Sequence, residues 1–228
     1  IISLIILDED EWHMNNSKPL TNLIYEQIYR DVVDGTFSPN DIVTESALIQ
    51  RYGVSKSPVR EALISLCDER VLQSVPRAGY RIVQFTPDEV RQIAETRQAL
   101  ELFMFDKSYP NLGERELDLL TESNDRIRAE DVPEMTAAQR WQSNVGFHLM
   151  LASFAGNAYM SGLLKSTLRI NARAATQYYQ NIYSPELEQK KRTHERFIQA
   201  CRERDYQSAR SILIDDTNQF FWWEVSHR

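Results

Sequence analysis

Residues 54–63 read VSKSPVREAL, and a helix start coincides there with polar and basic side chains. Ser55 is a typical N-cap, and Pro58 is tolerated in a first turn because amides there need no partner within the helix. Four apolar residues follow at helical spacing: Val59, Ala62, Leu63 and Leu66. We therefore predict a helix whose first turn exposes two hydroxyl groups, a lysine and an arginine: Ser55, Lys56, Ser57 and Arg60.

Two more helices are expected before this one. Apolar residues recur at helical spacing over residues 20–32, and Gly35 follows where a helix is expected to stop. Thr44 begins the next helix, which ends near Gly53. Two helices joined across a short glycine-containing turn form a helix-turn-helix, whose second helix lies in the major groove of DNA. Residues 55–60 would then contact base edges or phosphates; the alternative is a solvated, capped helix end.

A β-hairpin is expected after the third helix. Residues 72–75 and 80–83 read as two short strands around the turn 76–79. Arg77 can place a guanidinium in the minor groove, while Gly79 lets backbone approach closely. The alternative is a structural hairpin with a solvated arginine. Residues 17–85 are predicted to form a winged helix-turn-helix domain whose DNA contacts are Ser55, Lys56, Ser57, Arg60, Arg77 and Gly79.

The distribution of charge permits DNA binding although the net charge is −7. Four of the acids lie in residues 1–16, which we interpret as an N-terminal tail, whereas residues 17–86 hold eight bases against eight acids. Bases that cluster on one face attract phosphates even in a neutral domain. The apolar run IISLIIL is too short for a membrane span, and the widely spaced Cys67 and Cys201 suggest neither a disulfide framework nor a zinc cluster. A reducing cytoplasm fits this composition.

Residues 86–228 are predicted to form an all-α helical bundle, because they show no strand alternation and hardly any glycine. Breaks near residues 111–113, 131–133, 156–157, 184–185 and 205 indicate about six helices. The fold class is therefore mainly α, with the small hairpin wing as the β structure. The aromatic groups of residues 178–179 and 220–223 are interpreted as core or dimer contacts.

Polar residues on apolar helix stripes mark candidate sites in this bundle, because unpaired burial costs free energy. Arg97 lies on such a stripe in the helix that begins at Pro87, and Asn171 on another. The two are candidate effector-binding residues. The structural alternative for Arg97 is an ion pair with Glu101, four residues on. For Asn171 it is a role in capping or bridging neighbouring helices.

A candidate metal site consists of Asn144, His148, His194 and Asp216. Positions 144 and 148 share a helix face. Two imidazoles, a carboxylate and an amide oxygen suit a borderline divalent ion such as zinc, nickel or manganese. The spacing alone favours ordinary histidines over ligands.

The segment 54–63, together with Gly79 in the wing, resembles the winged helix of the GntR family. Lys56 stands where that family usually has arginine, and Arg70 where it usually has glycine. Lysine keeps the charge but loses the bidentate fork, which bears on base specificity at that contact.

The second segment resembles the ligand-sensing FCD domain of the FadR subfamily, and six helices suit its VanR-like branch. The resemblance implies a divalent metal on an Asp-x-x-x-His pair and two later histidines, with small carboxylates bound beside it. His148 and His194 match, whereas Asn144 stands at the aspartate position and Asp216 at the third histidine position. These substitutions either compensate in charge or mark a site that has lost its metal.

The expected function is that of a homodimeric transcriptional regulator, by resemblance a repressor, which binds a double-stranded operator and senses a small organic acid. The alternative is a metal-dependent hydrolase that uses His148, His194 and Asp216. No nucleophile or general base at a strong motif spacing accompanies these residues. Neither enzymatic activity nor membrane association is predicted.

Overall fold

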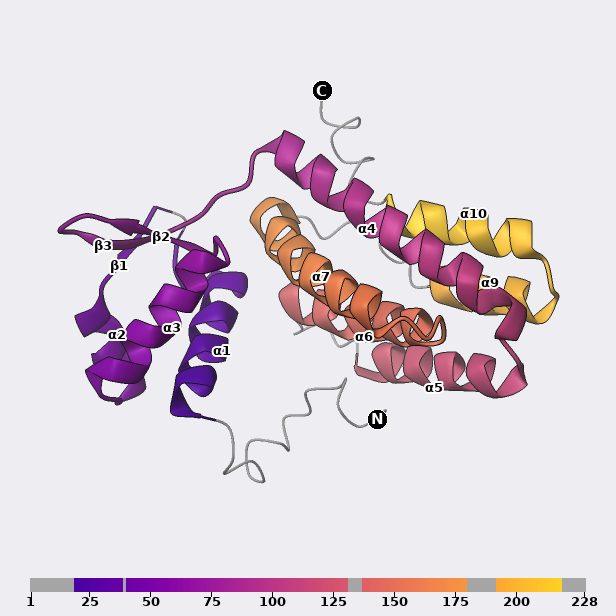
Figure 1. The fold of residues 1–228 in the computed structure, drawn as a ribbon, viewed down its shortest axis with the longest axis horizontal. Coiled ribbons are helices and arrows are strands. Elements are labelled where there is room, and N and C mark those ends of the chain that lie inside the picture. Colours follow the sequence, from indigo (N-terminus) through magenta and orange to yellow (C-terminus); the bar gives the residue numbers. More distant parts are fainter. Residues whose placement is uncertain (1–18, 39, 131–136, 180–191, 219–228) are drawn as a thin grey trace. The chain divides into compact units, whose positions relative to one another are not determined.

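The computed structural model describes residues 19–38, 40–130, 137–179 and 192–218. The chain divides into two compact units, Ile1–Phe85 and Thr86–Arg228, which Figure 1 colours along the sequence. The predicted tail (1–16), the predicted breaks near 131–133 and 184–185, the aromatic group at 220–223 and the side chains of residues 178–179 lie outside the described part.

The first unit holds the three predicted helices: α1 (Leu20–Val33), α2 (Glu45–Tyr52) and α3 (Lys56–Asp68). Thr44 caps α2 by accepting a hydrogen bond from the amide of Ala47 (3.2 Å), and Gly53 ends it with φ of 64°. Ser55 occupies the N-cap of α3, as predicted, although its hydroxyl makes no capping hydrogen bond. Local capping therefore sets the bounds of α2, whereas α3 begins at the expected residue without a side-chain cap.

An antiparallel sheet completes this unit, with strand order β1 (Ile42–Val43), β3 (Gly79–Ile82), β2 (Leu72–Val75). The hairpin β2–β3 is the predicted wing, with its second strand beginning one residue earlier than expected. The strand β1 was not predicted, because a two-residue strand has no periodicity of its own. It pairs Val43 with Tyr80 of the wing.

Gly79 is required by this pairing. A Cβ atom there would lie 2.6 Å from the carbonyl oxygen of Val43, and the glycine has φ of 138°. L residues with side chains rarely adopt such a conformation. Gly79 is therefore needed for the packing of β3 against β1, and its contact with DNA stays a prediction.

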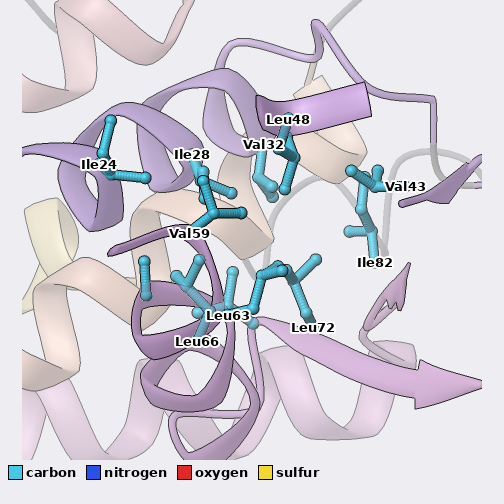
Figure 2. Packing of buried hydrophobic residues seen from close by; sticks show 12 residues of the cluster. Ile24, Ile28, Val32, Val43, Leu48, Val59, Leu63, Leu66, Leu72 and Ile82 are labelled. Atoms are coloured by element: carbon cyan, nitrogen blue, oxygen red, sulfur yellow. The ribbon is translucent and has the colours of Figure 1, made fainter. Parts of the chain in front are cut away.

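The core of the first unit lies between α1, α3 and the wing (Figure 2). Ile28, Val59 and Leu63 are fully buried there, joined by Leu66 and Leu72. Truncating such a side chain to alanine typically costs about 2–5 kcal/mol. This packing holds the exposed first turn of α3 and the wing on one rigid scaffold.

The second unit is a helical bundle in which the described residues form no strand. Its helices are α4 (Pro87–Ser108), the short 3₁₀ helix η3 (Tyr109–Asn111), α5 (Glu114–Glu130), α6 (Ala137–Ser153), α7 (Ala158–Tyr179), α9 (Thr193–Arg202) and α10 (Tyr206–Thr217). The helix α4 packs against α6, α7 and α10. It begins with a capping box in which Thr86 and Glu89 each accept a hydrogen bond from the other's backbone amide.

Among the described residues, no helix is both long enough and apolar enough to cross a bilayer.

Candidate functional site

The first turn of α3 presents the residues that the sequence singled out. The side chains of Lys56 and Arg60 are 65% and 59% exposed, while Pro58 and Val59 turn into the core. Ser57 donates a hydrogen bond to Glu61, one turn on (3.0 Å). The two cations and the two hydroxyl-bearing residues therefore lie together on the exposed side of the helix.

Both cations share one acid that the sequence reasoning missed. Glu45, the first residue of α2, lies 3.7 Å from the ammonium nitrogen of Lys56 and 3.3 Å from Nε of Arg60. The sequence places Glu45 directly after Thr44, at the start of a helix, and indicates no contact with the third helix. Its partners come from another helix, so only the folded chain reveals them.

The wing borders the same region. A groove of about 480 Å³ is lined by Glu45 and Lys56 on one side and by wing residues such as Arg77 and Tyr80 on the other. Arg77 is exposed at the hairpin turn and has φ of 64°. The start of α3 and the tip of the wing thus flank one groove.

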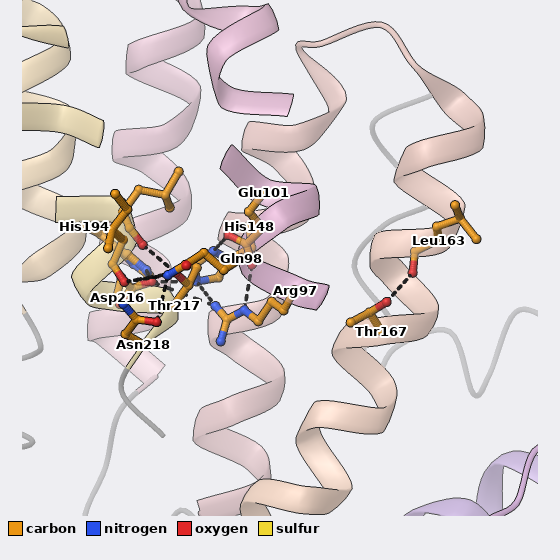
Figure 3. A network of polar contacts seen from close by, with 12 residues as sticks. Arg97, Gln98, Glu101, His148, Leu163, Thr167, His194, Asp216, Thr217 and Asn218 are labelled. Carbon is orange, nitrogen blue, oxygen red and sulfur yellow. Dashed lines mark hydrogen bonds and ion pairs between the residues drawn. The ribbon is translucent and has the colours of Figure 1, made fainter. Parts of the chain in front are cut away.

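A buried polar cluster lies inside the second unit, where four helices meet (Figure 3). Its members are Arg97 and Glu101 of α4, His148 of α6, His194 of α9 and Asp216 of α10, each at most 8% exposed. The structure brings together His148, His194 and Asp216, whose ligand atoms lie within 4.8 Å of one another.

His148 is the centre of this cluster. Its Nδ1 lies 2.6 Å from Oε2 of Glu101, and its Nε2 lies 3.0 Å from Nη2 of Arg97 and 3.1 Å from Oδ2 of Asp216. Since a carboxylate only accepts, Nδ1 carries a hydrogen toward Glu101, and Nε2 lies between Arg97 and Asp216. Glu101 thereby orients His148, a role that the sequence did not suggest.

Arg97 is held inside the cluster. Its Nε donates to Oε1 of Glu101 (2.6 Å), and its Nη2 lies 4.0 Å from Oδ2 of Asp216. The intrahelical pair weighed as a structural alternative is therefore formed. It coexists with contacts to His148 and Asp216, so Arg97 is the resident cation beside the candidate metal ligands.

His194 is fixed by two neighbours. Its ring stacks on that of Phe147, with centroids 3.8 Å apart, and its Nδ1 lies 3.2 Å from Oδ1 of Asn124. An amide oxygen accepts, so the Nδ1 hydrogen points to Asn124 and the lone pair of Nε2 points to Asp216, 3.9 Å away. Sequence reasoning missed Asn124 because its helix shows no distinctive spacing.

Burial and mutual charge separate the pKa values of the cluster. Burial lowers the pKa of His194 to about 4. Burial also disfavours the charged form of His148, but Glu101 and Asp216 outweigh it and raise that pKa. Burial alone would raise the pKa of Asp216 and of Glu101, yet hydrogen bonds and charges from His148 and Arg97 hold both below their usual range. At neutral pH the cluster combines two carboxylates, a guanidinium and a neutral His194.

The donor set fits a divalent metal. Bonds of about 2.0–2.1 Å to a tetrahedral ion place ligand atoms about 3.3 Å apart. His148 and Asp216 already have this spacing, and His194 would have to move closer. Asn144 lies one turn before His148 on α6 with a half-buried side chain.

Asn171 is fully buried on α7, which packs against α4 and α6. Within the described part of the chain, neither its amide nitrogen nor its amide oxygen has a hydrogen-bond partner. Buried amides are normally paired because an unpaired group retains its desolvation cost. Asn171 therefore stays a candidate effector-binding residue, because a ligand or an ordered water molecule would satisfy its amide.

Comparison with known proteins identifies both units. The bacterial regulatory proteins of the gntR family match residues 20–82, and the FCD domain matches residues 92–216, more than half of the chain. The chain belongs to the GntR family, with an FCD domain. It is a DNA-binding transcriptional regulator and not an enzyme, so the hydrolase alternative is set aside.

Relatives of this GntR regulator agree with that assignment. The HTH-type transcriptional regulator YdhC of Bacillus subtilis is 26% identical over 156 residues, covering 68% of this chain and 70% of YdhC. The HTH-type transcriptional repressor GlaR of Escherichia coli is 25% identical over 152 residues, covering 65% and 69%. The structure of E. coli McbR/YncC has the same fold, with a TM-score of 0.74 at 19% identity over 92% of this chain and 98% of that one.

Proposed function

We propose that this GntR regulator is a repressor whose FCD domain senses a small organic acid beside a divalent metal ion. The observation that carries the proposal is the buried cluster in which His148, His194 and Asp216 converge from three helices. Sensing, rather than catalysis, suits a family of regulators, and the name of the relative GlaR states repression. The six α-helices that the structure describes in the second unit suit the VanR-like branch of FCD domains.

The metal ligands in this proposal are His148, His194 and Asp216, with Asn144 contributing weakly. Zinc, nickel or manganese fits two imidazoles and a carboxylate. When bound, such an ion supplies positive charge that a carboxylate ligand can share. The chain prepares for it through Glu101 and Asn124, which fix the Nδ1 hydrogens of the two histidines and leave each Nε2 facing Asp216.

Arg97 and Asn171 are proposed to bind the organic acid. A guanidinium offers a planar fork that matches a carboxylate, and α4 holds it next to the proposed metal ligands. An amide with both polar groups unpaired among the described residues suits a hydroxyl or carbonyl group on the same ligand. A small acid with one such polar substituent is therefore the expected effector class.

The repressor is proposed to bind a two-fold operator as a homodimer in the cytoplasm. Each copy would place the first turn of α3 in the major groove and Arg77 of the wing in the adjoining minor groove. Ligand binding would shift the balance between forms that do and do not fit the operator.

Thermal shift measurements test the sensing proposal. The full chain, freed of metal with a chelator and carrying no affinity tag, is titrated with zinc, nickel or manganese chloride, alone and with a panel of small organic acids. We expect metal to raise the melting temperature and one class of acid to raise it further, as linkage requires. His148→Ala should abolish the metal response. A parent protein whose melting temperature none of these metals changes would refute the metal part of the proposal.

A further inference from the structure

The carboxylate of Glu45 lies among the DNA-binding cations. It contacts Lys56 and Arg60 of the first turn of α3, at 3.7 and 3.3 Å. It also faces Tyr80 of the wing: burial, then the charge of Glu45, raises the pKa of that phenol. Its own side chain is only 23% exposed, whereas those of its two partners are more than half exposed. The acid is therefore the fixed member of this group, and the cations reach toward it from the protein surface.

We infer that Glu45 is a specificity-determining residue. Its ion pairs with Lys56 and Arg60 weaken the binding of these cations to the phosphates of non-operator DNA and orient both cations for contact with the operator. The inference rests on the DNA-binding function of the family and does not depend on the proposed effector or metal. Glu45 itself is a positioning residue, since it acts through the two cations.

Pairing with Glu45 affects non-specific DNA binding first. Affinity for arbitrary DNA comes almost entirely from cations that neutralise phosphates and release counterions. A cation already paired with a carboxylate gains less from a phosphate, because one anionic partner merely replaces another. Pairing with Glu45 therefore weakens non-specific binding more than it weakens a contact with base edges.

Base edges compete with Glu45 for the two cations more effectively than phosphates do. Arginine that is bidentate to guanine gains two directed hydrogen bonds, which a misplaced phosphate does not supply. Exposed ion pairs are individually weak, so a well-matched base can break the Glu45 pairs whereas arbitrary sequence does so less often. The same pairs restrict where Arg60 points before DNA arrives, which lowers the entropy cost of a correctly placed contact.

A structural role is the competing interpretation. An acid in the first turn of α2 interacts favourably with the helix dipole, and its removal could weaken α2 without any effect on DNA selection. The variant Glu45→Asp separates the two interpretations, because it keeps the negative charge at the helix start but retracts the carboxylate from Lys56 and Arg60.

The experiment measures affinity by fluorescence anisotropy at several potassium chloride concentrations. One duplex is an operator selected from a random library with the parent protein, and the other is a scrambled duplex of equal length. The variants are Glu45→Gln and Glu45→Asp, with Glu61→Gln as matched control. Glu61 is an acid on α3 whose contacts are with Thr21 and Ser57.

We expect Glu45→Gln to bind the scrambled duplex several-fold more tightly and to lower the ratio of operator to scrambled affinity. Its plot of log affinity against log salt should steepen by about one for that duplex, as one added phosphate contact predicts. Glu45→Asp should change the ratio in the same direction, and Glu61→Gln should leave it close to the parent value. When Lys56→Gln and Arg60→Gln are both present, Glu45→Gln should no longer differ from Glu61→Gln.

Two outcomes would overturn the inference. In the first, Glu45→Gln and Glu61→Gln change both affinities equally, which would reduce Glu45 to a general charge effect. In the second, both duplexes bind Glu45→Asp with parent affinity and salt slope, which would leave Glu45 with only its role at the helix start. Circular dichroism and melting of each variant confirm that the fold persists.

Discussion

At the scale of single residues, Arg97 forms a buried ion pair on α4. Arg97 is 2% exposed and pairs with Glu101, which is equally buried. Breaking a buried pair by removing one partner leaves an uncompensated charge, at a cost of about 3–5 kcal/mol. Arg97 therefore contributes to stability as well as to the proposed binding of an effector.

The first prediction concerns this residue. Arg97→Leu should lower the free energy of unfolding by roughly 3–5 kcal/mol, the cost of an uncompensated buried charge, and should abolish the melting-temperature response to organic acids. Urea unfolding and thermal shift measure the two effects. Arg91→Leu is the matched control, because Arg91 pairs with Asp88 and Glu95 on the exposed side of the same helix and should change little. Unchanged affinity for an acid in calorimetry would assign Arg97 to structure alone.

The second prediction concerns pH. The pKa of His194 is about 4 in the folded chain, against about 6.5 for an unperturbed histidine. Between these values the unfolded chain binds more protons, so stability falls as the pH is lowered from about 6.5 to about 4. His148, whose pKa is raised, has the opposite sign and stabilises the fold at lower pH.

Chelator-treated parent and His194→Gln protein should be unfolded in urea at a series of pH values. The variant should lose up to one proton's worth of slope in the window between about 4 and 6.5. Parallel curves for the two proteins would show that His194 titrates normally in the folded chain.

At the scale of elements, the wing and the first turn of α3 must each pack against the core of the first unit and also expose side chains for DNA. Gly79 and Arg77 are two residues apart in one hairpin. Gly79 lies against the carbonyl group of Val43 in β1, whereas Arg77 is exposed in the turn. Substitutions at these positions should therefore separate stability from DNA binding.

The third prediction compares the two wing residues. Gly79→Ala should lower the melting temperature of the first unit and weaken DNA binding with it, because its Cβ would meet the carbonyl of Val43. Arg77→Ala should weaken DNA binding while the melting temperature stays near that of the parent. Calorimetry and gel shift are the measurements. A stable Gly79→Ala protein would mean that β1 moves aside.

The fourth prediction concerns the first turn of α3. Arg60→Ala should abolish specific binding of the operator with the fold intact, since a good base contact is worth about 1–3 kcal/mol. A gel shift at moderate salt tests this. Parent-like affinity for the operator would show that the recognition helix has been placed wrongly.

Sequence predicted the helices of both units because caps, glycines and apolar spacing are local signals. Thr44, Ser55 and Pro87 each start a helix where expected. The strand β1, the role of Glu101 and the pairing of Glu45 depend on residues distant in the sequence, and no local pattern reveals such contacts. His148, His194 and Asp216 were grouped through family resemblance, since their spacing alone favoured ordinary histidines.

At the scale of the whole molecule, the second unit exposes apolar side chains on two helices that pack together. Phe103 of α4 is 53% exposed, and Leu163 and Ile170 of α7 are 44% and 37% exposed. Apolar surface of this kind is typical of an interface between subunits. We propose it as part of the dimer contact.

The fifth prediction follows from this surface. Leu163→Glu should convert the dimer to a monomer and weaken operator binding, because two half-sites are then no longer bound together. Sedimentation measures the oligomeric state. Leu23→Glu, at a similarly exposed leucine of α1 in the first unit, is the control and should remain dimeric. A parent protein that is monomeric at micromolar concentration would contradict the proposal.

The helix α4 has a mechanical consequence. It has 22 residues and is about 33 Å long at the usual rise of an α-helix. Arg97 and Glu101 lie near its middle. Residues 83–86 connect it to the wing, and Val83 still donates a backbone hydrogen bond to Val71 of the first unit. A twist imposed on the middle of a stiff rod reaches its end with little loss. A ligand that rotated α4 would therefore act directly on residues 83–86, the short segment that joins α4 to the wing.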